Sequence, residues 1–287
     1  MISQKNRRKT KTDDIHIMPL LRWAGGKRFL VSRLKKFVPS DYKDRVYHEP
    51  FLGSASLFFS LHPERSVLSD ANEHLINCYK YVRDNPILIA DYLKEHGKKN
   101  SEKYYYEVRD IYNRSKPSVA QAARFIYLNR TCFNGIFRVN LSGKFNVPYG
   151  WKDSPILPDR TWLRNVSNFF KKATLNSDPF EKTLTLINAD DFVYLDPPYP
   201  PLNGTSYFTH YTKDRFVEED QRRLAEMVHC LNDLRCYILM SNADTPLIRE
   251  IFKSYNIVSL PVTRWITCKS QKHCVNELVI TNYKVGR

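Results

Sequence analysis

A short apolar run that stops at a proline-rich corner constrains the fold of this chain more than any other feature. Residues 191–200 read DFVYLDPPYP, and the apolar part, typical of a buried strand, ends at Asp196. The next residues, Pro197 and Pro198, fix two φ angles and remove two backbone N–H donors. The chain is therefore stiff there, and its carbonyl groups need other partners. The sequence predicts a core strand that presents the Asp196 carboxylate and the Tyr199 ring at a rigid turn.

Strand and helix patterns alternate along most of the chain, which predicts an α/β fold with a mostly parallel sheet. Further strands are expected near 45–49, 66–70, 171–177, 236–242 and 277–283. Helices are expected after residues 28 and 54, through much of 71–130, and at 218–234 and 245–255, with Asn72 as a helix cap. Between residues 131 and 150, Asn-Gly and Ser-Gly turns flank apolar segments and predict a β-hairpin.

This helical and hairpin region interrupts the α/β pattern, which predicts an inserted unit. We expect one discontinuous α/β domain at 19–70 and 163–287, with the insert at 71–162. Residues 1–18 are polar and basic, and we interpret them as a disordered arm.

The charge balance indicates the kind of partner. The chain has 45 Lys and Arg residues against 30 Asp and Glu, a formal net charge of +15. An excess this large favours a polyanion, most often nucleic acid, over a merely solvated basic surface. Hydrophobic residues make up 42% of the chain, which indicates an ordered globular protein.

Membrane and metal partners are not expected. No apolar run approaches the ~20 residues that a membrane span needs. The basic start lacks the apolar segment of a secretory signal. The six cysteines form no CxxC pair, so we expect reduced thiols rather than a metal site. These features are typical of a cytoplasmic protein.

Two predicted strand ends are candidates for a ligand site. Gly53 lies where a strand passes into a helix, and it allows a close backbone approach to a ligand, although the segment lacks the GxGxxG pattern. Asp70 ends the next strand, where a carboxylate commonly accepts hydrogen bonds from the two hydroxyls of a ribose. Asp70 could equally cap the helix that follows it.

The residues from Asp196 to Tyr199 suit the transfer of a methyl group to an amine conjugated with a ring. Positive charge develops on the amine nitrogen during attack, and a carboxylate oxygen with a neighbouring carbonyl can accept its two N–H groups. The Tyr199 ring offers a flat face against which an extruded base can stack, and for this the ring is needed rather than the hydroxyl. The alternative is a purely structural turn.

DPPY with an upstream FLG motif resembles the amino-group DNA methyltransferases that use S-adenosylmethionine. The order of cofactor motif, insert and catalytic motif resembles the subgroup of Dam and DpnII-type adenine methyltransferases. The resemblance rests on RWAGGK (22–27), EPFLGSASLFF (49–59), LSDAN (68–72), the segment 127–150, the segment 194–212 and LMSNADT (239–245). It implies a Rossmann-like methyltransferase sheet with an inserted helical and β-hairpin target-recognition domain.

The resemblance also implies roles for individual residues. Catalytic roles fall to Asp196, Pro197, Pro198 and Tyr199. Cofactor contacts fall to Trp23, Gly25, Lys27, Glu49, Phe51, Gly53, Asp70, Asn72, Asp178, Phe180 and Asp196. DNA contacts fall to Arg130, Phe133, Asn134, Ile136, Arg138, Asn140 and Pro148. Arg138 suits a guanine, because its planar guanidinium can pair with both O6 and N7.

Some departures from the family pattern bear on the target sequence. Phe133 stands where the family often has tyrosine, and serines follow Gly53. The basic segment 264–277, which we interpret as a loop, differs from that of Dam. A GATC or related short site in double-stranded DNA is expected, with methyl transfer to N6 of adenine. Methylation of cytosine N4, of an RNA base or of a protein glutamine is an alternative, as is a non-catalytic DNA-binding module. A cognate restriction endonuclease is compatible with the sequence, in a bacterial cell or a phage-infected host.

Overall fold

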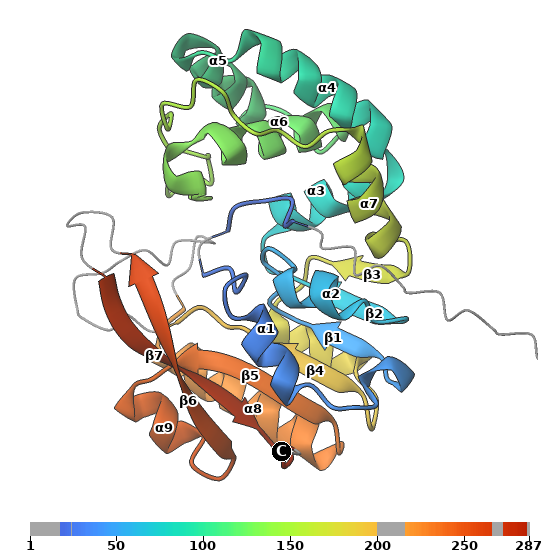
Figure 1. Cartoon of the computed structure of the whole chain (residues 1–287), viewed down its shortest axis with the longest axis vertical. Coiled ribbons are helices and arrows are strands. Elements are labelled where there is room, and N and C mark those ends of the chain that lie inside the picture. The colour runs from blue at the N-terminus through green and yellow to red at the C-terminus, as the bar shows by residue number, and fades with distance from the viewer. Residues whose placement is uncertain (1–17, 24, 200–215, 266–271, 286–287) are drawn as a thin grey trace, which may run out of the picture.

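The computed structural model describes residues 18–23, 25–199, 216–265 and 272–285 (Figure 1). Three expectations lie wholly or partly outside these residues. They are the disordered arm before residue 18, the part of the catalytic motif after Tyr199, and the middle of the basic segment, 266–271.

Within the described residues, seven strands form one sheet in the order β3-β2-β1-β4-β5-β7-β6. The strands are β1 Tyr47–Glu49, β2 Ser66–Ser69, β3 Ala173–Asn176, β4 Phe192–Leu195, β5 Tyr237–Ala243, β6 Asn256–Trp265 and β7 Lys272–Thr281. Strands β1 to β5 pair in parallel, whereas β7 is antiparallel to both β5 and β6. The strand order reverses between β1 and β4, and in such Rossmann-like sheets ligands bind beyond the carboxyl ends at the reversal. The predicted α/β fold is confirmed.

Strand β4 is buried on both faces of the sheet, as its apolar run predicted. Phe192 and Tyr194 join a hydrophobic cluster that continues into α2 and the helices of the predicted insert. Val193 and Leu195 point the other way, because side chains alternate along a strand, and they pack with α8 and α9. This burial fixes the end of β4, and with it the position of Asp196.

Helices cover the sheet and form a second group at one end of the molecule. They are α1 Val31–Leu34, α2 Ser56–Leu61, α3 Glu73–Asp84, α4 Pro86–Lys99, α5 Glu102–Tyr112, α6 Val119–Thr131, α7 Arg160–Phe170, α8 Glu218–Asp233 and α9 Pro246–Ile251. Figure 1 shows α4, α5 and α6 at the end opposite the sheet, with α3 and α7 between them and the strands. Asn72 caps α3 as predicted, because its side chain accepts from the Leu75 amide.

The segment 131–150 reverses direction as a hairpin would, but without a regular ladder. Val139 bridges to Phe145 and Cys132 to Tyr149, each as an isolated antiparallel pair. Proline and glycine residues within the segment limit continuous pairing. The predicted β-hairpin is therefore an irregular one.

The basic segment 264–277 was expected to be a loop, and this was wrong at both ends. Strand β6 runs to Trp265, and β7 begins at Lys272. The two strands pair antiparallel over ten residues each, so the carboxyl-terminal part of the chain is a long hairpin at the edge of the sheet.

Candidate active site

The loop after β1 and the residue after β2 meet at the carboxyl edge of the sheet. The Gly53 amide donates to Oδ2 of Asp70 at 2.9 Å, and the Asn72 amide donates to Oδ1 at 2.9 Å. Each carboxylate oxygen keeps capacity for a further hydrogen bond. Burial raises the pKa of Asp70 to about 6, although the two amides oppose this.

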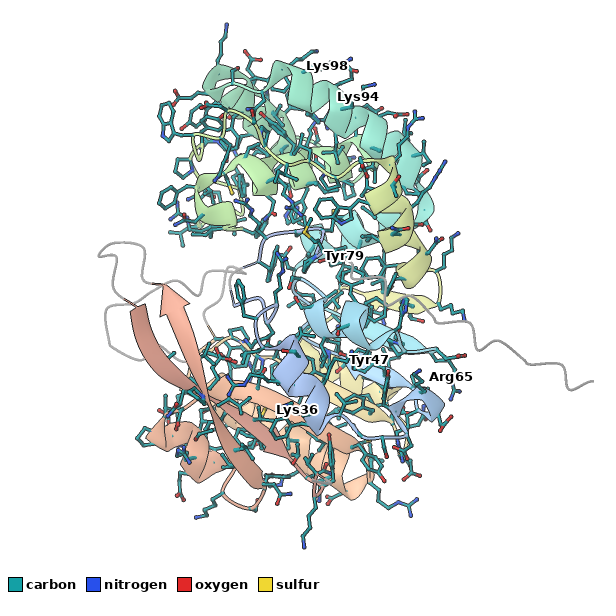
Figure 2. All side chains as sticks on the ribbon, viewed as in Figure 1. Lys36, Tyr47, Arg65, Tyr79, Lys94 and Lys98 are labelled. Atoms are coloured by element: carbon teal, nitrogen blue, oxygen red, sulfur yellow. The ribbon has the colours of Figure 1, made fainter. Side chains whose placement is uncertain are left out.

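Position 53 requires glycine for two reasons, its backbone conformation and the closeness of Trp23. Its φ of +46° lies in the left-handed region, and a Cβ there would lie 3.0 Å from Cδ1 of Trp23. The Tyr79 hydroxyl donates to the Gly53 carbonyl at 2.8 Å. Figure 2 shows Tyr79 in the interior of the molecule, as it does Tyr47. The loop is thus held from both sides, and Trp23 lies directly against it.

An aromatic cluster lies beside this loop. The rings of Phe51 and Phe180 stack with centroids 5.3 Å apart. Phe216 meets the Phe51 ring edge-on at 6.0 Å. Phe180 is buried and Phe51 is half-buried. Asp178 lies two residues after the end of β3 and two before Phe180. These rings form an apolar wall suited to a planar ligand group.

The carboxylate at the end of β4 is held by partners from two other parts of the chain. Oδ1 of Asp196 lies 2.8 Å from Nζ of Lys27 and accepts from the Ser241 hydroxyl at 2.8 Å. Lys27 also donates to the Gly25 carbonyl at 2.9 Å. The side chains of Lys27 and Asp196 are 6% and 18% exposed, so this is a largely buried ion pair. Within the described part of the chain, Oδ2 of Asp196 accepts no hydrogen bond.

Two further carboxyl groups at this edge have raised pKa values, as Asp70 does. Burial raises the pKa of Asp196, and Lys27 and Ser241 oppose it. Burial raises the pKa of Glu49 well above its usual value, even though the Tyr47 hydroxyl donates to its Oε2 at 2.8 Å. Perturbed carboxyl groups at one edge of a sheet are typical of a functional site.

The proline corner is fixed by a relay of buried amides. Nε2 of Gln221 on α8 donates to the Pro198 carbonyl at 3.1 Å. Nδ2 of Asn242 on β5 donates to Oε1 of Gln221 at 3.1 Å. Both amide side chains are buried. The Pro197 carbonyl, by contrast, accepts no hydrogen bond from any described residue. The expectation that this corner would seek partners for its carbonyls is met at Pro198.

Comparison with known proteins decides the family. Residues 23–266 match the family model of D12 class N6 adenine-specific DNA methyltransferases. The chain belongs to this family. Its relatives include the type II methyltransferase M1.LlaDCHI of Lactococcus lactis subsp. cremoris, 37% identical over 94% of this chain and 96% of the relative. The type II methyltransferase M.MjaIII of Methanocaldococcus jannaschii is 36% identical over 94% of this chain and 100% of the relative.

A third relative is named for its activity on adenine rather than as a type II methyltransferase. The DNA adenine methylase of Escherichia coli strain K12 is 32% identical over 93% of this chain and 95% of the relative. The resemblance to adenine-specific DNA methyltransferases is therefore confirmed, and the protein is an N6-adenine DNA methyltransferase of the D12 class.

In this methyltransferase the segment 131–150 is joined to the loop that carries Trp23. The Trp23 and Phe137 rings stack with centroids 5.8 Å apart. The Asn129 side chain accepts from the Arg22 amide and donates to the Arg22 carbonyl, both at 2.8 Å. A Cβ on Gly135 would lie 2.5 Å from the Arg22 side chain. The segment therefore packs directly on Arg22 and Trp23, beside the carboxyl edge of the sheet.

Most of the predicted DNA contacts of the methyltransferase lie at the surface of this segment. Phe133, Asn134, Arg138 and Pro148 are exposed, and Ile136 is half-buried. Nε of Arg138 donates to the Asn146 side chain at 2.8 Å, which holds the guanidinium plane in one orientation.

Two of the predicted DNA contacts have internal partners instead. The Arg130 guanidinium donates to the carbonyls of Pro19 and Leu20 and lies 4.8 Å from the Trp162 ring centroid. The Asn140 side chain accepts from the amides of Ser142 and Lys144 at 3.0 and 2.9 Å, so it forms the turn.

Four residues that contact this site were not predicted from the sequence: Ser241, Asn242, Gln221 and Glu277. The first two lie in LMSNADT, which the family resemblance included only as a motif. The sequence signal that could have indicated them is a pair of polar residues, Ser241 and Asn242, at the end of an otherwise apolar strand. Buried polar side chains need hydrogen-bond partners, so such residues are candidates for a site. Among the described residues, no helix could span a membrane and no cluster of His, Cys, Asp or Glu could hold a metal ion.

Proposed function

We propose that this methyltransferase uses S-adenosylmethionine to methylate N6 of an adenine turned out of duplex DNA, within GATC or a related short site. Adenine-specific DNA methylation follows from the family. The cofactor, the base flipping, the target sequence and the residue roles are the proposal. The observation that carries it is the buried Lys27–Asp196 pair at the end of β4, beside the loop that joins Gly53 to Asp70.

The residues beside β1, β2 and β3 fit S-adenosylmethionine. The Asp70 carboxylate can accept hydrogen bonds from the two ribose hydroxyls, since each of its oxygens accepts one backbone N–H and keeps a free lone pair. The wall of Phe51 and Phe180 suits the adenine ring, with Asp178 as an acceptor near its edge. Gly53 and Trp23 border the space between these groups. Four further residues are proposed to line or hold the cofactor site. The Asn72 amide holds Asp70, Lys27 holds the Gly25 carbonyl, and Glu49 lies at the end of β1.

The end of β4 supplies acceptors for the target amine. When bound, S-adenosylmethionine supplies an electrophilic methyl group. Lys27 and Ser241 hold Oδ1 of Asp196, which leaves Oδ2 to accept one N–H of the amine. The Pro197 carbonyl accepts the other N–H, while Gln221 holds the Pro198 carbonyl in place. Both acceptors stabilise the positive charge that develops on nitrogen, and they are oriented before the reaction.

The Tyr199 ring stacks on the extruded base. The Lys27 ammonium lies over one face of this ring, 4.3 Å from its centroid, so the base stacks on the opposite face. Stacking on an aromatic face is a common way to hold a flipped base.

The insert reads the DNA through the segment 131–150. Arg138, oriented by Asn146, pairs with a guanine, and Phe133, Ile136 and Pro148 contact neighbouring bases. Asn134, with φ of +54°, shapes the turn that presents them. Arg130 and Asn140 act by holding the segment in position. We retain the division into a catalytic domain at 19–70 and 163–287 and a recognition domain at 71–162, with α7 joining the two.

The names of the relatives support a biological setting. Two of them are named type II methyltransferases and another a DNA adenine methylase. A cytoplasmic enzyme of a bacterial cell or phage-infected host fits these names. So does a cognate restriction endonuclease that cuts the same site.

Mapping of methylated bases in plasmid DNA tests the proposed function. Cells that lack endogenous adenine methylation express either the protein or its Asp196→Ala variant, and single-molecule sequencing locates modified bases. We expect N6-methyladenine at one short sequence, with none for the variant. Modification of cytosine, or adenine modification without a sequence preference, would contradict the proposal.

A further inference from the structure

Glu277 lies at the catalytic edge although it comes from the antiparallel part of the sheet. It is on β7, where it pairs with Ala243 of β5 and with Leu260 of β6. Ala243 is the last residue of β5, so this pairing brings Glu277 to the carboxyl end of β5. Strand β4 lies on the other side of β5 and ends beside Asp196.

The Glu277 carboxylate is buried, at 4% exposed, and contacts the proposed catalytic residues. The Tyr199 hydroxyl donates to its Oε2 at 2.9 Å. The same oxygen lies 3.9 Å from Nζ of Lys27, which also faces the Tyr199 ring and pairs with Asp196. Tyr199, Glu277 and Lys27 thus form a closed ring of contacts, and Lys27 joins this ring to Asp196.

The hydrogen bond to Glu277 gives the Tyr199 hydroxyl a role in orienting the ring, which stacking alone does not require. A base stacks on a phenyl ring as well as on a phenol, so the sequence alone assigned importance to the ring. The proline corner fixes the backbone before Tyr199 but not its side-chain torsions. A hydrogen bond to a buried carboxylate restricts those torsions, because a buried charge that loses a partner is costly.

We propose that Glu277 is a positioning residue: it orients the Tyr199 ring through the hydroxyl and holds Lys27 between two carboxylates. The inference rests on the proposed roles of Asp196 and Tyr199. It makes the β6–β7 hairpin part of the active site rather than an edge that only completes the sheet.

A double-mutant cycle tests this role. Single-turnover methyl transfer to a duplex with one target site is measured for Tyr199→Phe, Glu277→Ala and the double variant. Cofactor and DNA affinities are measured in parallel, and thermal unfolding checks the fold. Tyr199→Phe should slow transfer roughly tenfold with affinities unchanged, since a hydrogen bond to a charged group is lost. Glu277→Ala in the Tyr199→Phe background should slow it much less than in the wild type, because the two residues act together.

The conservative variant Glu277→Gln shows whether the hydrogen bond to Tyr199, the negative charge of Glu277 or only the stability of the fold is what matters. Glu277→Gln keeps an acceptor for the Tyr199 hydroxyl, so it should retain most of the rate that Glu277→Ala loses. The emission of 2-aminopurine at the target position should be changed by Tyr199→Phe but not by Glu277→Gln, because it reports how the extruded base is stacked. Glu250→Gln on α9 and Tyr255→Phe shortly after it lie away from the site, and as matched controls they should leave the rate unchanged.

The outcomes distinguish this inference from the proposed function. Independent, multiplicative effects of Tyr199→Phe and Glu277→Ala, or a wild-type rate for Tyr199→Phe, would overturn the role of Glu277 alone. A Glu277→Gln variant as slow as Glu277→Ala would also overturn it, because the acceptor would then not be what matters. If the wild type transfers no methyl group to adenine, the proposed function fails and this inference fails with it.

Discussion

The Lys27 ammonium lies 2.8 Å from Oδ1 of Asp196, although one residue precedes α1 and the other follows β4. Ser241 donates to the same oxygen from β5. Three separate parts of the chain thus fix one carboxylate at the carboxyl edge of the sheet. A buried pair with such partners is oriented before any substrate arrives, which is the condition for electrostatic stabilisation of a developing charge.

Removal of this carboxylate should abolish catalysis but not DNA binding. Asp196→Ala deletes the acceptor for the target amine, and the basic surface of the protein is unchanged. We expect the single-turnover rate to fall roughly 10²–10³-fold or more, the scale for one preorganised electrostatic partner. Gel-shift and radiolabel assays on the same preparations measure both properties. An intact fold that no longer binds duplex DNA would show that the two roles are not separate.

The pH dependence of cofactor binding should report Asp70. Its folded-state pKa of about 6 lies above the usual value of 3.8 because the carboxyl group is buried, so protonated Asp70 predominates below about pH 6 in the free protein. Ribose hydroxyls donate to the ionised form, and S-adenosylmethionine affinity should therefore be full above pH 6 and fall as the pH drops through it. The fall should approach about tenfold per pH unit.

The Asp70→Asn variant is the control for this titration. It should bind the cofactor more weakly at every pH and lose the dependence around pH 6. The pKa of Glu49 is also raised, so a dependence that persists in Asp70→Asn would assign the titration to another group such as Glu49.

The sign of the stability effect follows from the same shift. At pH values between the usual pKa of Asp70 and about 6, a larger fraction of Asp70 is protonated in the folded state than in the unfolded state. Its contribution to the free energy of unfolding should therefore decrease as pH rises through this interval and stay constant above it. Thermal unfolding of the wild type and Asp70→Asn, compared between pH 4 and 7, checks this sign.

Local pattern predicted the strand ends but not the contacts between them. The apolar run of β4 and the turn residues after it placed Asp196, and the cap at Asn72 was predicted correctly. The partners Lys27, Ser241 and Glu277 are distant in sequence from Asp196, and no periodicity links them. Their proximity depends on how the strands are ordered in the sheet.

Strand β6 was missed for a physical reason. It lies at the edge of the sheet and is half-exposed, so its pattern is less apolar than that of β4. It also contains Pro261, which a central strand would exclude and an edge strand tolerates. Because β6 was missed, the start of β7 was interpreted as a loop, and only the strand from Glu277 onward was predicted.

Arg138 should control sequence preference rather than the rate at every site. Arg138→Ala should relax discrimination at one guanine by about 1–3 kcal/mol, the value of a bidentate pair with a base edge. Competitive methylation of a library of site variants measures this. Lys144→Ala, exposed on the same segment, is the matched control and should weaken all sites alike. If Arg138→Ala leaves the preference unchanged, the segment 131–150 is not the element that reads the guanine.

Substitution of Asn146 should also relax discrimination at the guanine that Arg138 contacts. It holds Nε of Arg138 at 2.8 Å, so Asn146→Ala should relax the same base position by a smaller amount. The same library measures it, and a change at a different position would show that Asn146 contacts DNA itself.

DNA affinity should fall steeply as salt is added. A protein with a formal net charge of +15 displaces condensed counterions when it neutralises phosphates. The logarithm of the binding constant should fall linearly with the logarithm of salt concentration, with a slope of about −0.9 per phosphate contacted. Fluorescence anisotropy with a labelled duplex gives the slope. A flat line would contradict a phosphate-contacting interface.

The most direct test of the central claim is transfer of a radiolabelled methyl group from S-adenosylmethionine to defined duplexes. One duplex contains a single GATC site, and a second is identical except that the adenine of the site already carries an N6-methyl group on both strands. We predict label on N6 of adenine in the first duplex, none in the second, and none in either duplex with Asp196→Ala. Equal labelling of both duplexes, or label recovered on cytosine, would contradict it.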